Sequence, residues 1–174
     1  LNARLQANAP PASERVVLVN AAGAIHALDA GNGQLQWSRY LACSPTDRPL
    51  ISADSRFAWL VDRQQHELVS VNALTGNLLW RQPLGDAPVG SPLLLDSKIV
   101  LTLAKGKLQS FAASSGELQA TAELPQPAAS GAIATDDGQQ LLQLADEGLL
   151  YVLSAADLKC TAAHYLGHDR GTAL

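Results

Sequence analysis

Few residues of this chain have the types and spacing that chemistry requires. His164 and His168, followed by Asp169, could place metal ligands on one side of the chain. Two histidines at the end of a strand more often belong to a solvated tail, so the sequence predicts no metal site. Cys43 and Cys160 are far apart and belong to no Cys-x-x-Cys pair, so their spacing supports neither a metal site nor a disulfide.

Motifs for nucleophilic catalysis or phosphate binding are missing from the sequence. Serines fall in turn sequences such as Ser114-Ser115, and there is no Gly-x-Ser-x-Gly nucleophile elbow. No glycine-rich loop has phosphate-binding spacing. Asp29 and Asn72 hold one position in two similar segments, where we expect them to bond turn amides rather than a metal. We therefore predict that the chain is not an enzyme and uses no cofactor.

Composition excludes further classes of function. The 174 residues carry a net charge of −4 without a basic run, so we expect no nucleic-acid-binding surface. Hydrophobic residues make up 47% and charged residues 16%, as in a folded globular chain. No apolar stretch is long enough to span a bilayer, so no transmembrane segment is expected. The first residue is Leu1 rather than Met, which suggests a processed or excised product.

A repeat organises the rest of the sequence. Similar turn segments end at Gly33, Gly76, Gly116 and Leu158, which lie 43, 40 and 42 residues apart. Each is flanked by short strand patterns, about four per unit. A period near forty residues with four strands predicts an all-β fold, a β-propeller. We place four antiparallel, four-stranded blades at approximately residues 1–42, 43–85, 86–125 and 126–167, with a tail at 168–174.

The second unit shows the strand pattern most clearly. Residues 57–61 form an apolar run, and residues 67–72 alternate between polar and apolar, as a half-covered strand does. Gly76 ends the following turn, where glycine adopts positive φ without steric cost. In the first unit the innermost strand is ambiguous, because either residues 3–7 or the chain after Gly167 could supply it.

A helix competes with strands over Leu141–Ala163, which is rich in the helix formers Leu and Ala. Gly148 interrupts this segment, at the repeat position that Gly23 and Gly106 hold in other units. The repeat therefore favours strands here.

Two of the turn segments resemble a family motif. Residues 27–37 read Ala-x-Asp-x-x-Asn-Gly-x-x-x-Trp, and residues 70–80 read Ser-x-Asn-x-x-Thr-Gly-x-x-x-Trp. Both are similar to the Ala-x-Asp-x-x-Thr-Gly-x-x-x-Trp motif of pyrroloquinoline-quinone-type propeller repeats. In that family the Trp docks on the neighbouring blade, against the turn Gly. The resemblance implies structural docking, rather than ligand stacking, for Trp37, Trp80, Gly33, Gly76 and Gly116.

The later copies depart from the motif. The third keeps Gly116 but has Ala120 at the Trp position, and the fourth has Leu158 and Ala162 at the two positions. We read this as decay of the docking motif in a divergent array.

Members of the resembled family are of two kinds. Quinoprotein dehydrogenases hold the quinone with calcium on the propeller axis, whereas others, similar to the outer-membrane barrel-assembly lipoprotein, keep the repeat without a cofactor. Residues 91–110 resemble the second kind, and the vicinal cysteine pair of the dehydrogenases is absent. The resemblance implies a non-catalytic protein-binding or scaffold domain, periplasmic or associated with a bacterial cell envelope. Alternatives are a cytoplasmic location, a fragment of a quinone-dependent dehydrogenase, or a sensor domain attached to a signalling enzyme such as a Ser/Thr kinase.

Binding in propellers concentrates on the loops of one face. Those loops are the connections between blades and the turns between second and third strands. We therefore expect protein partners to contact residues of both kinds of loop: Asp47, Arg48, Arg63, Gln65, His66, Asp86 and Lys105.

Four blades are fewer than such repeats normally use. The family resemblance implies closure at seven or eight blades, so four would leave apolar flanks exposed. We expect part of a larger ring, either as a fragment of a longer propeller or as a homodimer that completes an eight-bladed ring.

Overall fold

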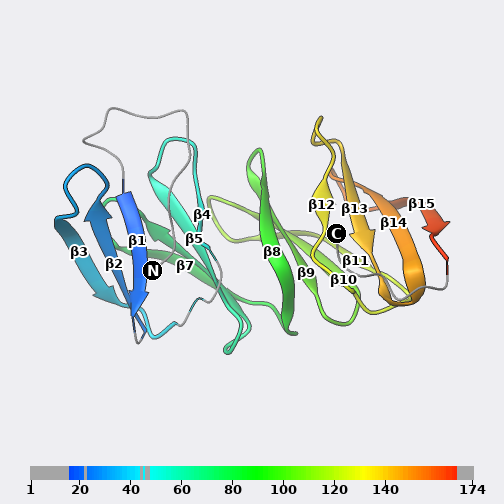
Figure 1. Cartoon of the computed structure of the whole chain (residues 1–174), viewed down its shortest axis with the longest axis horizontal. Coiled ribbons are helices and arrows are strands. Elements are labelled where there is room, and N and C mark those ends of the chain that lie inside the picture. The colour runs from blue at the N-terminus through cyan, green and yellow to red at the C-terminus, as the bar shows by residue number, and fades with distance from the viewer. Residues whose placement is uncertain (1–15, 22, 44, 46–47, 168–174) are drawn as a thin grey trace. The chain divides into compact units, whose positions relative to one another are not determined.

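The computed structural model describes residues 16–167, except 22, 44, 46 and 47. Its strands form four antiparallel β-sheets, and the chain divides into two compact units, Leu1–Gly85 and Asp86–Leu174 (Figure 1). The predicted all-β class is confirmed.

The first unit holds two sheets whose strands follow one another in chain order. Sheet one consists of β1 (Val16–Ala21), β2 (Ala24–Asp29) and β3 (Leu35–Tyr40). Sheet two consists of β4 (Leu50–Ile51), β5 (Phe57–Asp62), β6 (Glu67–Asn72) and β7 (Leu78–Pro83). Sheet one has three strands within the described residues instead of the predicted four. Both candidates for its fourth strand, residues 3–7 and the chain after Gly167, lie outside them.

The second unit repeats this order. Sheet three consists of β8 (Pro88–Leu95), β9 (Lys98–Leu103), β10 (Lys107–Ala112) and β11 (Leu118–Glu123). Sheet four consists of β12 (Ile133–Ala134), β13 (Gln140–Leu144), β14 (Leu149–Ser154) and β15 (Cys160–Tyr165). A single turn of 3₁₀ helix, η2 (Asp146–Gly148), joins β13 to β14. The strand prediction for residues 141–163 is therefore confirmed over the helical alternative.

The turn before the last strand has one geometry in all four sheets. The N–H of its last residue donates to the carbonyl four residues earlier, at 2.8 Å for Gly33, Gly76 and Gly116 and at 2.9 Å for Leu158. These residues have φ of 73°, 73°, 74° and 59°. The ladder beside each turn also contains a register shift at the same repeat position. The repeat thus persists in sheet four, where the glycine is missing.

Burial of sheet two corrects one expectation. In β6 the residues Leu68, Val69, Ser70 and Val71 are all buried, so both faces of the strand are covered. The polar and apolar alternation of residues 67–72 predicted a half-covered strand, and that was wrong. Ser70 reads as a solvent-facing residue in the sequence, but its small side chain fits a packed interior.

Candidate functional site

The turn between β5 and β6 carries three of the predicted partner-binding residues. Asp62 at the end of β5 is 1% exposed, and its Oδ1 accepts hydrogen bonds from the N–H groups of Gln64 and Gln65, both at 2.9 Å. A carboxylate that bonds amides two and three residues ahead holds the turn in one conformation. On this turn Gln65 is exposed, and Arg63 and His66 are half-buried.

His66 occupies a backbone position that glycine holds in the other three sheets. Its φ is 53°, against 82°, 78° and 74° at Gly23, Gly106 and Gly148. The carbonyl at each of these four positions accepts the N–H of the residue that follows the last strand of its sheet, so the geometry is shared. A left-handed conformation costs a non-glycine residue on the order of 1 kcal/mol. Such outliers concentrate at functional sites.

Arg81 on β7 holds the connection between sheets one and two. Its Nη1 donates to Glu67 Oε2 at 2.8 Å, and its Nη2 donates to the carbonyl of Leu41 at 2.5 Å. Cys43, on the same connection, is 1% exposed. Burial raises the pKa of the Cys43 thiol, and the nearby Arg81 guanidinium acts in the opposite direction. The start of the connection that leads to Arg48 is therefore anchored.

The sequence did not point to Arg81. It lies on an outer strand, and its partner is the main-chain carbonyl of Leu41, which no residue pattern identifies. Its other partner, Glu67, lies 14 residues before it in the sequence.

The remaining predicted contact residues fall in different places. Arg48 is exposed, and Asp47 lies outside the described residues. In the second unit, Lys105 Nζ and Asp86 Oδ2 are 3.9 Å apart, and the Lys105 side chain is 86% exposed. A pair at this distance with one largely exposed partner contributes little to stability. The structure thus groups Arg63, Gln65 and His66 on one turn and pairs Asp86 with Lys105.

The turn of sheet two also receives a tryptophan from sheet one. Trp37 is 7% exposed, and its Nε1 donates to the carbonyl of Ala73 at 2.9 Å. A Cβ added to Gly76 would lie 2.5 Å from Cε3 of Trp37, whereas one added to Gly33 would meet nothing within 4 Å. Gly76 is therefore restricted both by its φ and by the indole. Trp80 is half-buried, and Gly116 has the same turn conformation as Gly76.

In sheets three and four, the large and small residues are at the opposite positions from those of the Trp37 and Gly76 contact. Leu158, at the Gly76 position, is 1% exposed. Ala120, at the Trp37 position, packs against the same hydrophobic cluster that contains Leu158. A large turn residue thus accompanies a small residue on the outer strand. Both residues thus take part in one packed cluster, although neither is the residue that the motif has at its position.

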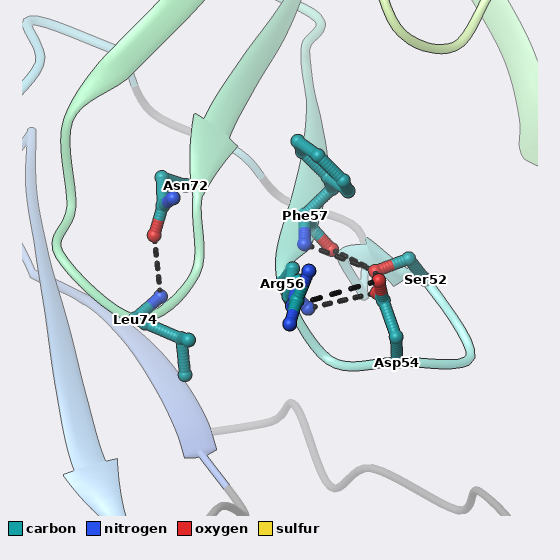
Figure 2. A network of polar contacts seen from close by, with 6 residues as sticks. All are labelled: Ser52, Asp54, Arg56, Phe57, Asn72 and Leu74. Atoms are coloured by element: carbon teal, nitrogen blue, oxygen red, sulfur yellow. Dashed lines mark hydrogen bonds and ion pairs between the residues drawn. The ribbon is translucent and has the colours of Figure 1, made fainter.

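The opposite turns of sheet two hold a separate polar network (Figure 2). Ser52 Oγ donates to Asp54 Oδ1 at 2.6 Å, and the Arg56 N–H donates to the same oxygen at 3.1 Å. These bonds lower the pKa of Asp54, with the Ser52 hydroxyl as the larger cause. Asn72 Oδ1 accepts the N–H groups of Leu74 and Thr75 at 3.0 Å each. These side chains satisfy turn amides.

Sheet four repeats the first of these turns. Thr135 Oγ1 donates to Asp137 Oδ1 at 2.6 Å, and the Gln139 N–H donates to the same oxygen at 3.0 Å. The pKa of Asp137 is lowered, mainly by the Thr135 hydroxyl. In sheet one, Asp29 Oδ1 likewise accepts turn amides, from Gly31 at 2.8 Å and Asn32 at 3.0 Å.

Metal-binding clusters and membrane-spanning helices are both missing from the described residues. Within this part of the chain, no group of three or more His, Cys, Asp and Glu side chains could hold a metal ion. His164 is exposed, and His168 and Asp169 lie outside the described residues. Among the same residues, no helix is long and apolar enough to cross a membrane.

Repeated sheets with a shared turn geometry, and a tryptophan seated on the next turn, define a β-propeller built from quinone-type repeats. A sequence model of one such family, described as outer membrane protein assembly factor BamB, matches residues 1–98. This is more than half of the chain, which therefore belongs to that family.

Comparison with solved structures agrees on the fold. The crystal structure of BamB from Moraxella catarrhalis matches with a TM-score of 0.69 and 17% sequence identity. The match covers 90% of this chain and 47% of that chain, so the present chain spans about half the length of its structural relative. No curated protein sequence matches.

Proposed function

We propose that this chain is a non-catalytic scaffold domain that binds protein partners in the bacterial cell envelope, on its periplasmic side. The supporting observation is the turn of Arg63, Gln65 and His66, whose backbone is held by the buried Asp62 carboxylate. Membership of a family described as outer membrane protein assembly factor supports the same proposed function. The proposed partner is therefore a component of outer membrane protein assembly.

The physical argument rests on a preorganised loop. A loop that is already ordered loses less conformational entropy on binding, so more of the contact energy appears as affinity. Arginine is enriched among the residues that dominate interface energies. Arg63 and His66 are half-buried beside the exposed Gln65, and Arg81 anchors the neighbouring connection that leads to the exposed Arg48.

The experiment places a photo-crosslinking amino acid at position 65 and, as the control, at the exposed Gln36 on β3. The chain is expressed in the periplasm of a Gram-negative host. The outer membrane assembly proteins of that host are then purified, and their crosslinks to the chain are identified. We expect a crosslink to an assembly protein from position 65 that is reduced by Arg63→Ala. Equal crosslinking from positions 65 and 36 would contradict the proposal.

The absence of catalysis is tested separately. The chain is mixed with pyrroloquinoline quinone and Ca²⁺, and the absorbance of the quinone is followed during titration. We expect no saturable spectral change. A saturable change with dye-linked alcohol oxidation would favour the quinone-dependent dehydrogenase instead.

A further inference from the structure

The Arg81 guanidinium connects two loops of the first unit. Its Nη1 donates to Glu67 Oε2 at 2.8 Å, and its Nη2 donates to the carbonyl of Leu41 at 2.5 Å. Glu67 begins β6 directly after the turn that ends at His66, and Leu41 follows β3 at the start of the connection to sheet two. One side chain therefore contacts both the turn that carries the proposed partner contacts and the neighbouring connection.

The turn of residues 63–66 is held at both ends. At its start, the buried Asp62 carboxylate accepts two N–H groups of the turn. At its end, the carbonyl of His66 accepts the N–H of Leu84, the residue after β7, at 2.8 Å. Leu84 and Arg81 thus attach β7 to the same end of the turn, so the turn is ordered before a partner binds.

The start of the connection after β3 is held in an unfavourable backbone conformation. Leu41 donates its N–H to the carbonyl of Gly23 at 3.1 Å, and Leu41 and Cys43 are both buried. Ala42 between them is exposed and has φ of 51°. A left-handed residue other than glycine persists only where the surrounding structure holds it. The hydrogen bond from Arg81 to the Leu41 carbonyl is part of that structure.

The charges that act on Cys43 show that the connection lies beside the turn. Burial is the main cause of the raised pKa of the Cys43 thiol, and the charges of Arg81, Asp62 and Glu67 also contribute. Asp62 directly precedes the turn and Glu67 directly follows it. Cys43 is therefore close to both ends of the turn.

Sheet two departs from the repeat at these positions. Glu67 and Arg81 carry opposite charges, whereas none of the equivalent pairs in the other three sheets does: Ala24 with Ser38, Lys107 with Thr121, and Leu149 with Ala163. His66, directly before Glu67, is the non-glycine residue at a position that glycine holds in those three sheets. Three departures thus coincide at one place, and departures from a local pattern are expected at functional sites.

His66 also changes the space over the turn. A Cβ added at the equivalent Gly106 would collide with the carbonyl of Gln126, and one added at Gly148 would lie 2.5 Å from the carbonyl oxygen of Gly167. In sheets three and four, main chain after the last strand therefore fills the space that the His66 Cβ takes in sheet two. The turn of sheet two has a side chain where those turns are covered by backbone.

We propose that Arg81 is a positioning residue that joins this turn and the connection into one partner-binding surface. We define the coupled surface as Ala42 of the connection together with Arg63, Gln65 and His66 of the turn. Given the proposed function, on which this rests, the partner is the same component of outer membrane protein assembly, and it contacts both loops at once. Two loops that are fixed relative to each other before binding lose less entropy on binding than two independent loops.

The first test measures labelling of Cys43 in a Cys160→Ala background, without any partner. Arg81→Met keeps an aliphatic side chain but cannot donate a hydrogen bond, so it should accelerate native-state labelling of Cys43 at least roughly tenfold. Arg56→Met, at a side chain that is 69% exposed, is the matched control and should leave the rate unchanged. Urea unfolding of each variant corrects for global stability. Acceleration no larger than the change in the global unfolding equilibrium would overturn the proposal.

The second test places the photo-crosslinking amino acid at the exposed Ala42 as well as at position 65. We expect both positions to crosslink to the same assembly protein, and Arg81→Met to reduce both yields roughly tenfold. Arg56→Met should reduce neither yield. A crosslink from position 65 that Arg81→Met does not affect, or that has no counterpart from position 42, would overturn the coupling and leave the proposed function standing. Failure of position 65 to crosslink in the otherwise unaltered chain would contradict the proposed function, and the coupled surface with it.

Discussion

At Gly76, the absence of a Cβ atom leaves room for the indole of Trp37, so that sheet one packs on the turn of sheet two. Its turn conformation is the same as that of Gly33, with φ of 73° at both, yet only at Gly76 would a Cβ meet the indole of Trp37. The two glycines therefore separate the backbone requirement from the packing requirement.

This pair defines the first prediction. Gly33→Ala should lower the free energy of unfolding by about 1 kcal/mol, through its positive φ alone. Gly76→Ala should cost a further ~1–3 kcal/mol, because the indole must move. Urea unfolding followed by tryptophan fluorescence measures both. Equal losses would show that Trp37 adapts without cost.

The two cysteines provide the second prediction. Cys43 is buried and Cys160 is exposed, so a chromogenic disulfide reagent should label Cys160 rapidly and Cys43 only after unfolding. Cys160→Ala should remove the rapid phase. Slow labelling of Cys43 in the native state requires the connection between sheets one and two to stay closed.

Burial also raises the pKa of Cys43, so above its ordinary value of 9.0 the unfolded chain loses the thiol proton before the folded chain does. The unfolded state then binds fewer protons, and stability should fall as the pH rises through this range. Cys43→Ala should reduce this fall in thermal melts between about pH 8 and about pH 10, a window on either side of that ordinary value. An unchanged slope would contradict it.

At the scale of the elements, sheets one and two pair a large outer-strand residue, Trp37, with a small turn residue, Gly76. Sheets three and four have the small residue Ala120 on the outer strand and the large residue Leu158 in the turn. Ala120→Trp should overpack the cluster and lower the free energy of unfolding by about 1–3 kcal/mol. Leu158→Gly should leave a cavity and lower it by roughly 2–5 kcal/mol. The double variant should be more stable than the sum of the two losses predicts, by at least about 1 kcal/mol. A double-mutant cycle by urea unfolding measures this coupling, and additive losses would show that the two residues do not share space.

The sequence predicts the elements better than their environment. Turn segments at a period near forty residues locate the strands, because the turn chemistry is local. Burial is not local: Ser70 lies inside because both faces of β6 are covered. Leu158 takes the φ of a glycine because tertiary packing holds it there, which no propensity predicts.

Only some residues of the candidate site can be named from the sequence, because local turn positions are predictable and long-range contacts are not. Loop positions follow from the order of strands, so Arg63, Gln65 and His66 could be named from the sequence. The left-handed backbone of His66 could have been inferred by aligning it with Gly23, Gly106 and Gly148. The Arg81 contact with the Leu41 carbonyl depends on how the connection folds back, and that needs the structure.

The small residue Ala120 and the large residue Leu158 limit the order in which sheets of this kind can follow one another along a chain. If sheet four were placed directly after sheet one by recombination, Trp37 would meet Leu158 instead of a glycine. If sheet two followed sheet three, Ala120 would face Gly76 and leave a void. Repeats of this chain are therefore not interchangeable parts, and a viable duplication or shuffling event must carry neighbouring sheets as a pair.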